Sequence, residues 1–149
     1  GDETNLLPSL YEIVMTPHAG RGLKATASIK QGTLIMIAPT IRVPSAQYHN
    51  HCIHTVFEDY LFKGKSGDYH LALAHGSIFN HSAKANVNWI LNEKLNEIKY
   101  YAWKTIEAGS DLFINYGRWG QQYEKELEIE DNQDEGESSS EGENDFLYK

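Results

Sequence analysis

The stretch Ser77-Ile78-Phe79-Asn80-His81-Ser82-Ala83-Lys84-Ala85-Asn86 decides how this chain is interpreted, because it lies between two shorter motifs. Gly20-Arg21-Gly22-Leu23 precedes it, and Asp111-Leu112-Phe113-Ile114-Asn115-Tyr116-Gly117 follows it. Each motif alone has a plain structural explanation. A G-x-G is often only a tight turn, an Asn-His-Ser triplet is usually a polar turn, and the last segment reads as a buried strand. Their order within one short chain makes them informative together.

Outside these motifs, short β-prone runs separated by turn signals predict a mostly β domain. The expected strands are residues 11–16, 23–28, 33–38, 40–43, 55–62, 70–74, 87–91, 98–103 and 112–116. The pair 87–91 and 98–103 should form a hairpin, and Pro39 and Pro44 bracket the run 40–43. Helix is expected only as a turn near 47–53 and over 119–129.

The acidity of the chain is concentrated near its C-terminus. Residues 1–123 hold 11 Lys and Arg against 10 Asp and Glu, whereas residues 124–149 hold 2 Lys against 11 acids. The two parts therefore carry +1 and −9. Residues 130–145 have almost nothing to bury, so we expect a loosely tethered acidic tail after one domain.

Composition excludes several classes of protein. The chain has no run of 18 apolar residues, which predicts no membrane span, and no secretory signal is visible. A single cysteine, Cys52, excludes an intramolecular disulfide and a Cys-cluster zinc site. We therefore expect a reducing, intracellular environment.

Taken together, the three motifs resemble those of SET-domain protein lysine methyltransferases. Gly20-Arg21-Gly22 and the residues after it resemble the opening of that domain. Asn80-His81-Ser82 with Asn86 resembles its R-F-x-N-H-S-C-x-P-N signature, and 111–117 resembles its closing E-L-x-x-D-Y-G motif. The resemblance implies a SET domain of the β-clip type over residues 11–122, with a pseudoknot loop, followed by a C-terminal helix and tail over 123–149.

The resemblance also implies a site. S-adenosyl-L-methionine (AdoMet) would be held by six residues, with Tyr116 also the catalytic residue, and Asn86 would fix the threaded loop. The six cofactor-binding candidates are Gly20, Arg21, Gly22, Asn80, His81 and Tyr116. Candidates for the walls of a lysine channel are Tyr60, Trp89, Ile114 and Trp119.

Four positions depart from the family pattern. Ser77 stands where Arg is common, Ala85 replaces Pro, and Asn115 replaces Asp. Ala83 replaces a Cys that helps to bind zinc in many relatives. We therefore expect no structural metal, and we interpret His49, His51, Cys52 and His54 as a loop or partly buried turn.

The overall pattern is most similar to compact, stand-alone SET proteins of a large algal virus and of fungi, through 58–62 and 72–82. That similarity implies a nuclear enzyme that methylates a histone H3 tail or nucleosome and forms a homodimer, without membrane contact or sequence-specific nucleic-acid binding. Three alternatives remain open: a non-histone lysine or histidine methyltransferase, a degenerate SET domain acting as a histone-binding scaffold, and a β-clip domain that binds carbohydrate or ice.

Overall fold

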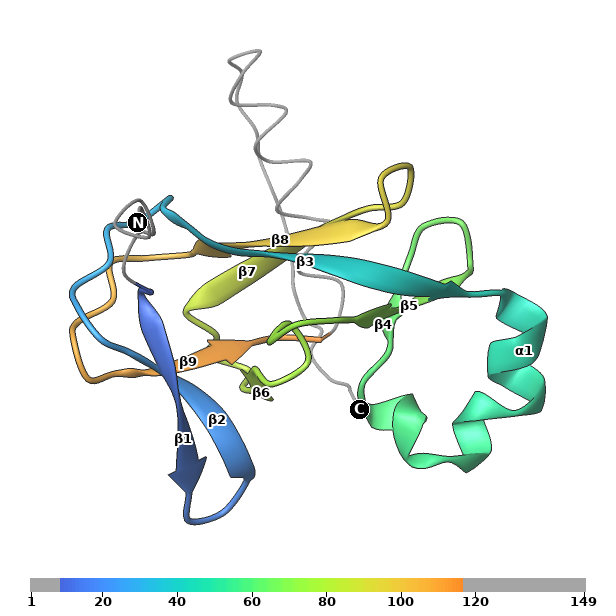
Figure 1. Ribbon diagram of the computed structural model, residues 1–149, viewed down its shortest axis with the longest axis horizontal. Coiled ribbons are helices and arrows are strands. Elements are labelled where there is room, and N and C mark those ends of the chain that lie inside the picture. Colours follow the sequence, from blue (N-terminus) through green and yellow to red (C-terminus); the bar gives the residue numbers. More distant parts are fainter. Residues whose placement is uncertain (1–8, 117–149) are drawn as a thin grey trace, which may run out of the picture.

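The structure is a computed structural model that describes residues 9–116, and nine strands make up two sheets (Figure 1). The smaller sheet has the order β1-β2-β9-β6 and the larger has the order β4-β5-β3-β8-β7. The strands of the smaller sheet are β1 (Tyr11–Thr16), β2 (Gly20–Ala25), β6 (Asn80–His81) and β9 (Asp111–Ile114). Those of the larger sheet are β3 (Leu34–Val43), β4 (Phe62–Lys63), β5 (Tyr69–Ala72), β7 (Val87–Asn92) and β8 (Glu97–Ala102). The expected mostly β architecture is confirmed.

Helical structure within the described residues is limited to one segment between β3 and β4. It consists of α1 (Ser45–Asn50) and the 3-10 helices η2 (Cys52–His54) and η3 (Val56–Asp59). Figure 1 shows this segment at one end of the larger sheet. No helix within residues 9–116 is long and apolar enough to cross a bilayer.

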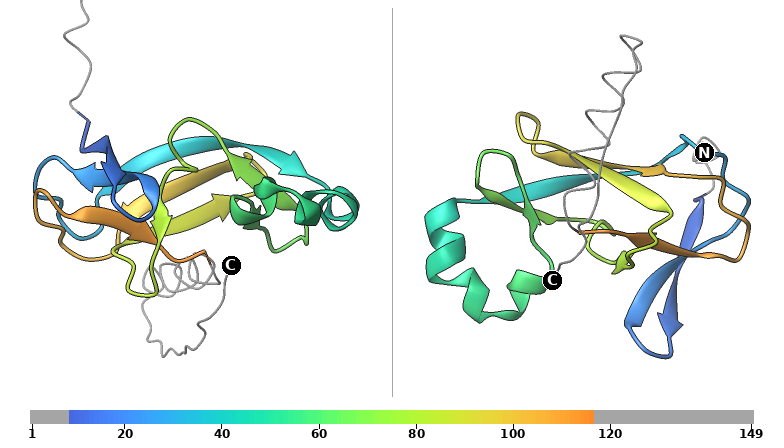
Figure 2. Two further views of the ribbon diagram at one scale, coloured as in Figure 1. Left: turned by 90° about the horizontal axis from the view of Figure 1, so that it is seen from below. Right: turned by 180° about the vertical axis from the view of Figure 1, so that it is seen from behind.

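Both sheets contribute side chains to one hydrophobic core. Figure 2 shows the arrangement of the strands from two further directions. Leu23 and Leu112 come from the smaller sheet, and Trp89, Ile98 and Tyr100 come from the larger sheet; all are almost completely buried. Buried residues alternate with partly buried ones along β8, as in a strand with one face on the core. The core thus fixes the end of β9, from which Tyr116 follows.

The hairpin of β7 and β8 forms as expected, with six registered residue pairs. Its connection is stabilised by Asn92, whose Oδ1 accepts hydrogen bonds from the backbone N–H groups of Lys94 and Leu95. Asn96 adopts a left-handed conformation with φ of 53°, which asparagine tolerates better than most residues.

Two strand predictions were wrong. Strand β3 runs through Pro39 without a break, because the pairing of β3 with β8 ends at Pro39 and the pairing with β5 begins at Thr40. Proline lacks an N–H, and this is tolerated at Pro39 because the β3–β8 pairing ends there and the β3–β5 pairing begins at the next residue. Of the expected strand 55–62, only Phe62 lies in a strand, as the first residue of β4. Residues 55–61 form η3 and a turn, in which the Thr55 side chain accepts a hydrogen bond from Phe57 N–H and Val56 and Phe57 are exposed.

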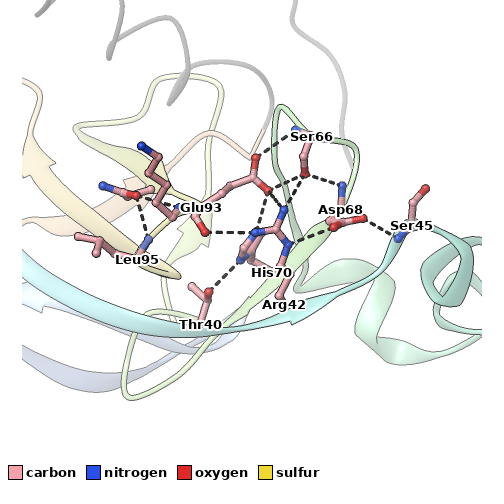
Figure 3. A network of polar contacts seen from close by, with 10 residues as sticks. Thr40, Arg42, Ser45, Ser66, Asp68, His70, Glu93 and Leu95 are labelled. Carbon is pink, nitrogen blue, oxygen red and sulfur yellow. Dashed lines mark hydrogen bonds and ion pairs between the residues drawn. The ribbon is translucent and has the colours of Figure 1, made fainter.

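A polar network connects the larger sheet to the start of α1 (Figure 3). Its centre is His70, which is fully buried and hydrogen-bonds Thr40 Oγ1 at 2.8 Å and Glu93 Oε1 at 3.0 Å. Arg42 bridges Glu93 and Asp68, and Asp68 accepts the backbone N–H of Ser45 at 2.9 Å. The network joins β3, β5, the β7–β8 connection and α1.

Candidate active site

A cavity of about 760 Å³ lies where the three sequence motifs meet. Its size is that of a typical small-molecule site. Strands β2 and β6, labelled in Figure 1, contribute to its wall. The lining residues are Ala19, Gly20, Arg21, Asp59, Tyr60, Ser77, Ile78, Phe79, Asn80, His81 and Tyr116.

The β1–β2 turn forms one wall of this cavity. Thr16 Oγ1 accepts the Ala19 N–H and donates to the Gly20 carbonyl, which closes the turn. Gly20 has φ of +73°, a conformation that glycine adopts without steric cost. Gly20 therefore adds no side chain to the cavity wall, whereas Arg21 beside it also lines the cavity.

Gly22 is required for a different reason, the close approach of Asn80. A Cβ added at Gly22 would lie 2.7 Å from Asn80 Nδ2 and 3.1 Å from Thr16 Cγ2. The same Asn80 Nδ2 donates a hydrogen bond of 3.1 Å to the Arg21 carbonyl oxygen. The Asn80 side chain thus connects two motifs that are distant in sequence.

The Asn-His-Ser segment is fixed by the third motif. Asn80 and His81 form β6, which pairs in parallel with Phe113 and Ile114 of β9. Asn86 holds the far end of the loop, because its side chain donates to the Asp111 carbonyl and accepts from Phe113 N–H, both at 2.9 Å. Both ends of the loop 80–86 are therefore pinned to β9, which supports the expected role of Asn86.

Tyr116 follows β9 and reaches the cavity. Its ring lies parallel to the His81 imidazole with centroids 5.9 Å apart, and tilted against Phe62 at 5.1 Å. Its backbone N–H donates to His81 Nδ1 at 3.2 Å, and its hydroxyl donates to the Phe79 carbonyl at 3.4 Å. The phenol is thus held by contacts on several sides.

The electrostatics of the site keep this phenol protonated. Burial is the main cause that raises the pKa of Tyr116, and the neighbouring Tyr60 and Asp59 raise it further. Tyr116 can therefore act as a hydrogen-bonding and packing group but not as a base near neutral pH.

Residues 59 and 60, at the end of η3, complete the cavity. Tyr60 is partly buried and its backbone N–H donates to the Phe57 carbonyl at 2.9 Å. Asp59 adds a carboxylate, whereas Arg21 supplies a guanidinium at the β1–β2 turn. The cavity therefore offers partners for both negative and positive groups of one ligand.

Two of the expected channel residues do not line the cavity. Trp89 is 1% exposed, and its indole N–H donates to the Asn115 carbonyl at 2.8 Å. Ile114 is completely buried in the core. Trp89 instead packs edge-on against Phe62 at 5.0 Å, so it supports Tyr116 indirectly. Trp119 lies outside the described residues.

Several lining residues were not among the sequence candidates. Asp59, Ser77, Ile78 and Phe79 flank the positions that the motifs indicated. The signal was their adjacency to Tyr60 and Asn80. Ser77, at the position where Arg is common, donates through Oγ to the Ala72 carbonyl at 2.7 Å.

The histidines near Cys52 lie on α1, η2 and the residue between them. His49 Nδ1 is 2.9 Å from the Ser45 carbonyl oxygen, a contact within the first turns of α1. Within the part of the chain that the structure describes, no group of three His, Cys, Asp or Glu side chains is arranged to hold a metal ion.

Comparison with known proteins gives a consistent result. Residues 20–117 match the SET domain family. A curated relative from Schizosaccharomyces pombe, named "Histone-lysine N-methyltransferase, H3 lysine-37 specific", is 35% identical over 112 residues, which are 75% of this chain and 76% of the relative.

Two solved structures share the fold. A Plasmodium falciparum protein assigned as a histone methyltransferase has a TM-score of 0.59 and 25% identity, and the match covers 74% of this chain and 96% of that protein. The Neurospora SET domain protein DIM-5, a histone lysine methyltransferase, has a TM-score of 0.58 with 18% identity over 71% of this chain and 51% of its own, a likeness of fold alone.

Proposed function

Because this chain belongs to the SET-domain family of protein-lysine methyltransferases, we propose that it methylates a lysine of histone H3 and that the cavity beside Tyr116 holds AdoMet. The observation that carries this proposal is the convergence of Gly20 and Arg21, Asn80 and His81, and Tyr116 on one cavity. The histone assignment is supported by the specificity in the name of the S. pombe relative.

The residues present fit AdoMet. The ligand carries a carboxylate, an ammonium and a sulfonium, and the lining offers Arg21 for the first and Asp59 for the positive groups. Gly20 adds no side chain to the cavity wall, so its backbone can present a carbonyl oxygen to a cation. Ile78 and Phe79 supply apolar surface for a flat ring.

When bound, AdoMet supplies a methyl group on a positively charged sulfur. The protein must then align the lysine amine, because an in-line displacement depends on geometry more than on acid–base groups. The Tyr116 hydroxyl, held against the Phe79 carbonyl, can orient that amine while its ring forms a wall beside Phe62.

The protein must also favour the neutral amine. A free lysine has a pKa of about 10.4, so a neutral amine at pH 7 costs about 4.6 kcal/mol. The partly buried rings of Tyr60 and Tyr116 would remove water from the ammonium and lower the pKa of the substrate lysine. Asp59, at the exposed end of η3, would attract the charged form as it approaches.

Two further assignments belong to the same proposal. A histone substrate places the protein in the nucleus. A homodimer is supported by exposed apolar residues on one face of the larger sheet, namely Ile37 and Ile41 of β3 and Leu73 beside them, whose N–H donates to the Pro39 carbonyl.

The proposal is tested by mass spectrometry of histone octamer and nucleosomes incubated with the protein and AdoMet. We expect the mass of histone H3 to increase in steps of about 14 Da, the mass of one CH₂ group for each methyl transferred. The Tyr116→Phe variant should produce no such increase under the same conditions. Methylation only of unrelated proteins would contradict the histone assignment. A wild-type protein that binds AdoMet or histone without methylating any protein would contradict the enzyme assignment.

A further inference from the structure

A second cavity, of about 230 Å³, shares no lining residue with the first. It lies beside the loop that follows His81 and beside the start of β7 and the end of β8. The lining residues are Ala83, Lys84, Ala85, Val87, Asn88, Trp103, Lys104 and Asn115. None of them has a role in the proposed methyl transfer.

Asn88 shows what this cavity lacks. The residue is 3% exposed, and its Oδ1 accepts the Trp89 backbone N–H at 3.1 Å. Because an N–H can only donate, this bond fixes which end of the amide is oxygen. Nδ2 is buried and has no acceptor among the residues that the structure describes. Since buried N–H groups are almost always paired, a ligand atom that accepts hydrogen bonds is expected beside it.

The chemical class of that ligand follows from the neighbouring charges. Lys84 and Lys104, both exposed side chains, add two ammonium groups to the lining. Ammonium groups and an amide N–H₂ donate only, so the matching group is an anionic acceptor. Val87 and Trp103 supply apolar surface against which a short aliphatic stem can pack. A carboxylate side chain meets both requirements, and a basic histone tail does not.

We propose that this cavity is a carboxylate-binding site and that its occupant is the acidic segment 130–145 of the same chain. That segment contains eight Asp and Glu residues, and residues 124–149 carry a net charge of −9. Thirteen residues lie between Tyr116 and Glu130, so the two are fourteen steps apart along the chain, a span of up to roughly 46 Å. That reach exceeds the radius of gyration of about 13 Å for a domain of this size, so the segment can reach the cavity.

Occupation of the site would affect the loop 80–86, which carries the Asn-His-Ser motif. The loop 80–86 is pinned to β9 at both ends, and Asn115 lines the second cavity directly before Tyr116. A bound carboxylate would therefore restrain this loop at residues 83–85 without entering the first cavity. The proposal does not depend on methyltransferase activity, so the two proposals fail separately.

The test is zero-length carbodiimide crosslinking of the full-length chain, followed by mass spectrometry. The carbodiimide adds to a carboxylate and forms an activated ester. A lysine amine then attacks the carbonyl carbon of that ester, so an amide forms and the urea derived from the reagent leaves. We expect amides from residues 130–145 to be concentrated on Lys84 and Lys104, and to join peptides of the same molecule when isotope-labelled and unlabelled chains are mixed. Lys94, at the far end of β7 from Asn88, is the internal reference.

Asn88→Asp is the matched variant, because it keeps the oxygen that accepts from Trp89 and replaces the donor with a second acceptor. We expect it to reduce the crosslinks at Lys84 and Lys104 by at least about fivefold and to leave those at Lys94 unchanged. Equal yields over all three lysines in the wild-type protein, or crosslinks only between labelled and unlabelled chains, would overturn the proposal. The wild-type distribution decides this even if the variant does not fold.

Discussion

At the scale of single residues, the contact between Gly22 and Asn80 helps to shape the cavity in which we propose that AdoMet binds. Asn80 was expected to bind the cofactor, and in the structure its side chain hydrogen-bonds the Arg21 carbonyl and packs where a Cβ at Gly22 would lie. The residue therefore shapes the wall of the cavity as well as lining it.

This coupling leads to a double-mutant prediction. Gly22→Ala would place a Cβ 2.7 Å from Asn80 Nδ2, so Asn80 must move and AdoMet affinity should fall at least about tenfold. In an Asn80→Ala background the added methyl group meets less resistance, and the same substitution should cost less. Titration calorimetry of the four proteins measures both effects. Additive losses of affinity would show that the two residues act independently.

A substitution at Tyr116 should distinguish an effect on turnover from an effect on AdoMet binding. Tyr116→Phe removes the hydroxyl that we propose orients the amine, and keeps the ring beside His81 and Phe62. We expect kcat on histone H3 to fall at least about 100-fold, a loss of about 2.7 kcal/mol in transition-state stabilisation. AdoMet affinity should change by less than about threefold. Near-normal kcat would remove Tyr116 from the mechanism.

The pH dependence at this site follows from the raised pKa of Tyr116. Because the phenol stays protonated at and above neutral pH, its ionisation should not limit the rate between about pH 7 and 9. A rate that rises in this range should reflect deprotonation of the substrate lysine. Tyr116→Phe should therefore retain the same rising profile at its lower rate, and a loss of the profile in that variant would indicate that Tyr116 acts as a base.

The sequence predicted part of this site because the motif residues are themselves the lining. It left two roles open for Trp89, a core aromatic or a wall of the lysine channel, since an aromatic residue on a strand can face either, and the structure places it in the core. The sequence could not predict Asp59, whose position depends on the turn that η3 makes.

At the scale of elements, the network around His70 joins four segments. Burial alone would raise the pKa of Glu93, but hydrogen bonds from His70 and Ser66 outweigh it and lower that pKa below its ordinary value. A hydrogen bond from Arg42 and one from the Ser45 backbone lower the pKa of Asp68. Both carboxylates therefore favour the charged form in the folded protein.

The lowered pKa values of Glu93 and Asp68 predict that the free energy of unfolding falls in acid. Because the folded-state pKa values are lowered, the stabilisation is present above the unfolded values of about 4 and is lost as pH falls through the folded values. Glu93→Gln should lower the free energy of unfolding at neutral pH by about 2 kcal/mol and flatten its fall in acid. Urea unfolding across this range, with the exposed Glu107→Gln as control, measures both. An unchanged acid slope would contradict the role of the network.

The elements also show where sequence reasoning succeeds and fails. The β7–β8 hairpin was predicted because two strongly β-prone runs are separated by the polar residues Asn92–Asn96. The continuous β3 was missed because proline is normally a boundary, and only the change of partner strand at Pro39 makes it acceptable there. Residues 55–62 were β-prone by composition, but the capping side chain of Thr55 favours a helical turn.

At the scale of the whole molecule, the proposed homodimer should depend on the exposed face of β3. Ile41→Lys adds a charge to that face, so association measured by sedimentation equilibrium should weaken at least about tenfold. Leu95→Lys, which changes an equally apolar and exposed residue in the β7–β8 connection, is the matched control and should have no effect. A dimer that both variants leave intact would exclude this face.

The central claim is that the cavity between β2, β6 and Tyr116 holds the methyl donor. A crystal structure with S-adenosyl-L-homocysteine tests it most directly. We expect the ligand in this cavity, its carboxylate beside Arg21 and its sulfur facing the Tyr116 side chain. A ligand bound elsewhere, with the cavity filled only by water, would contradict the account.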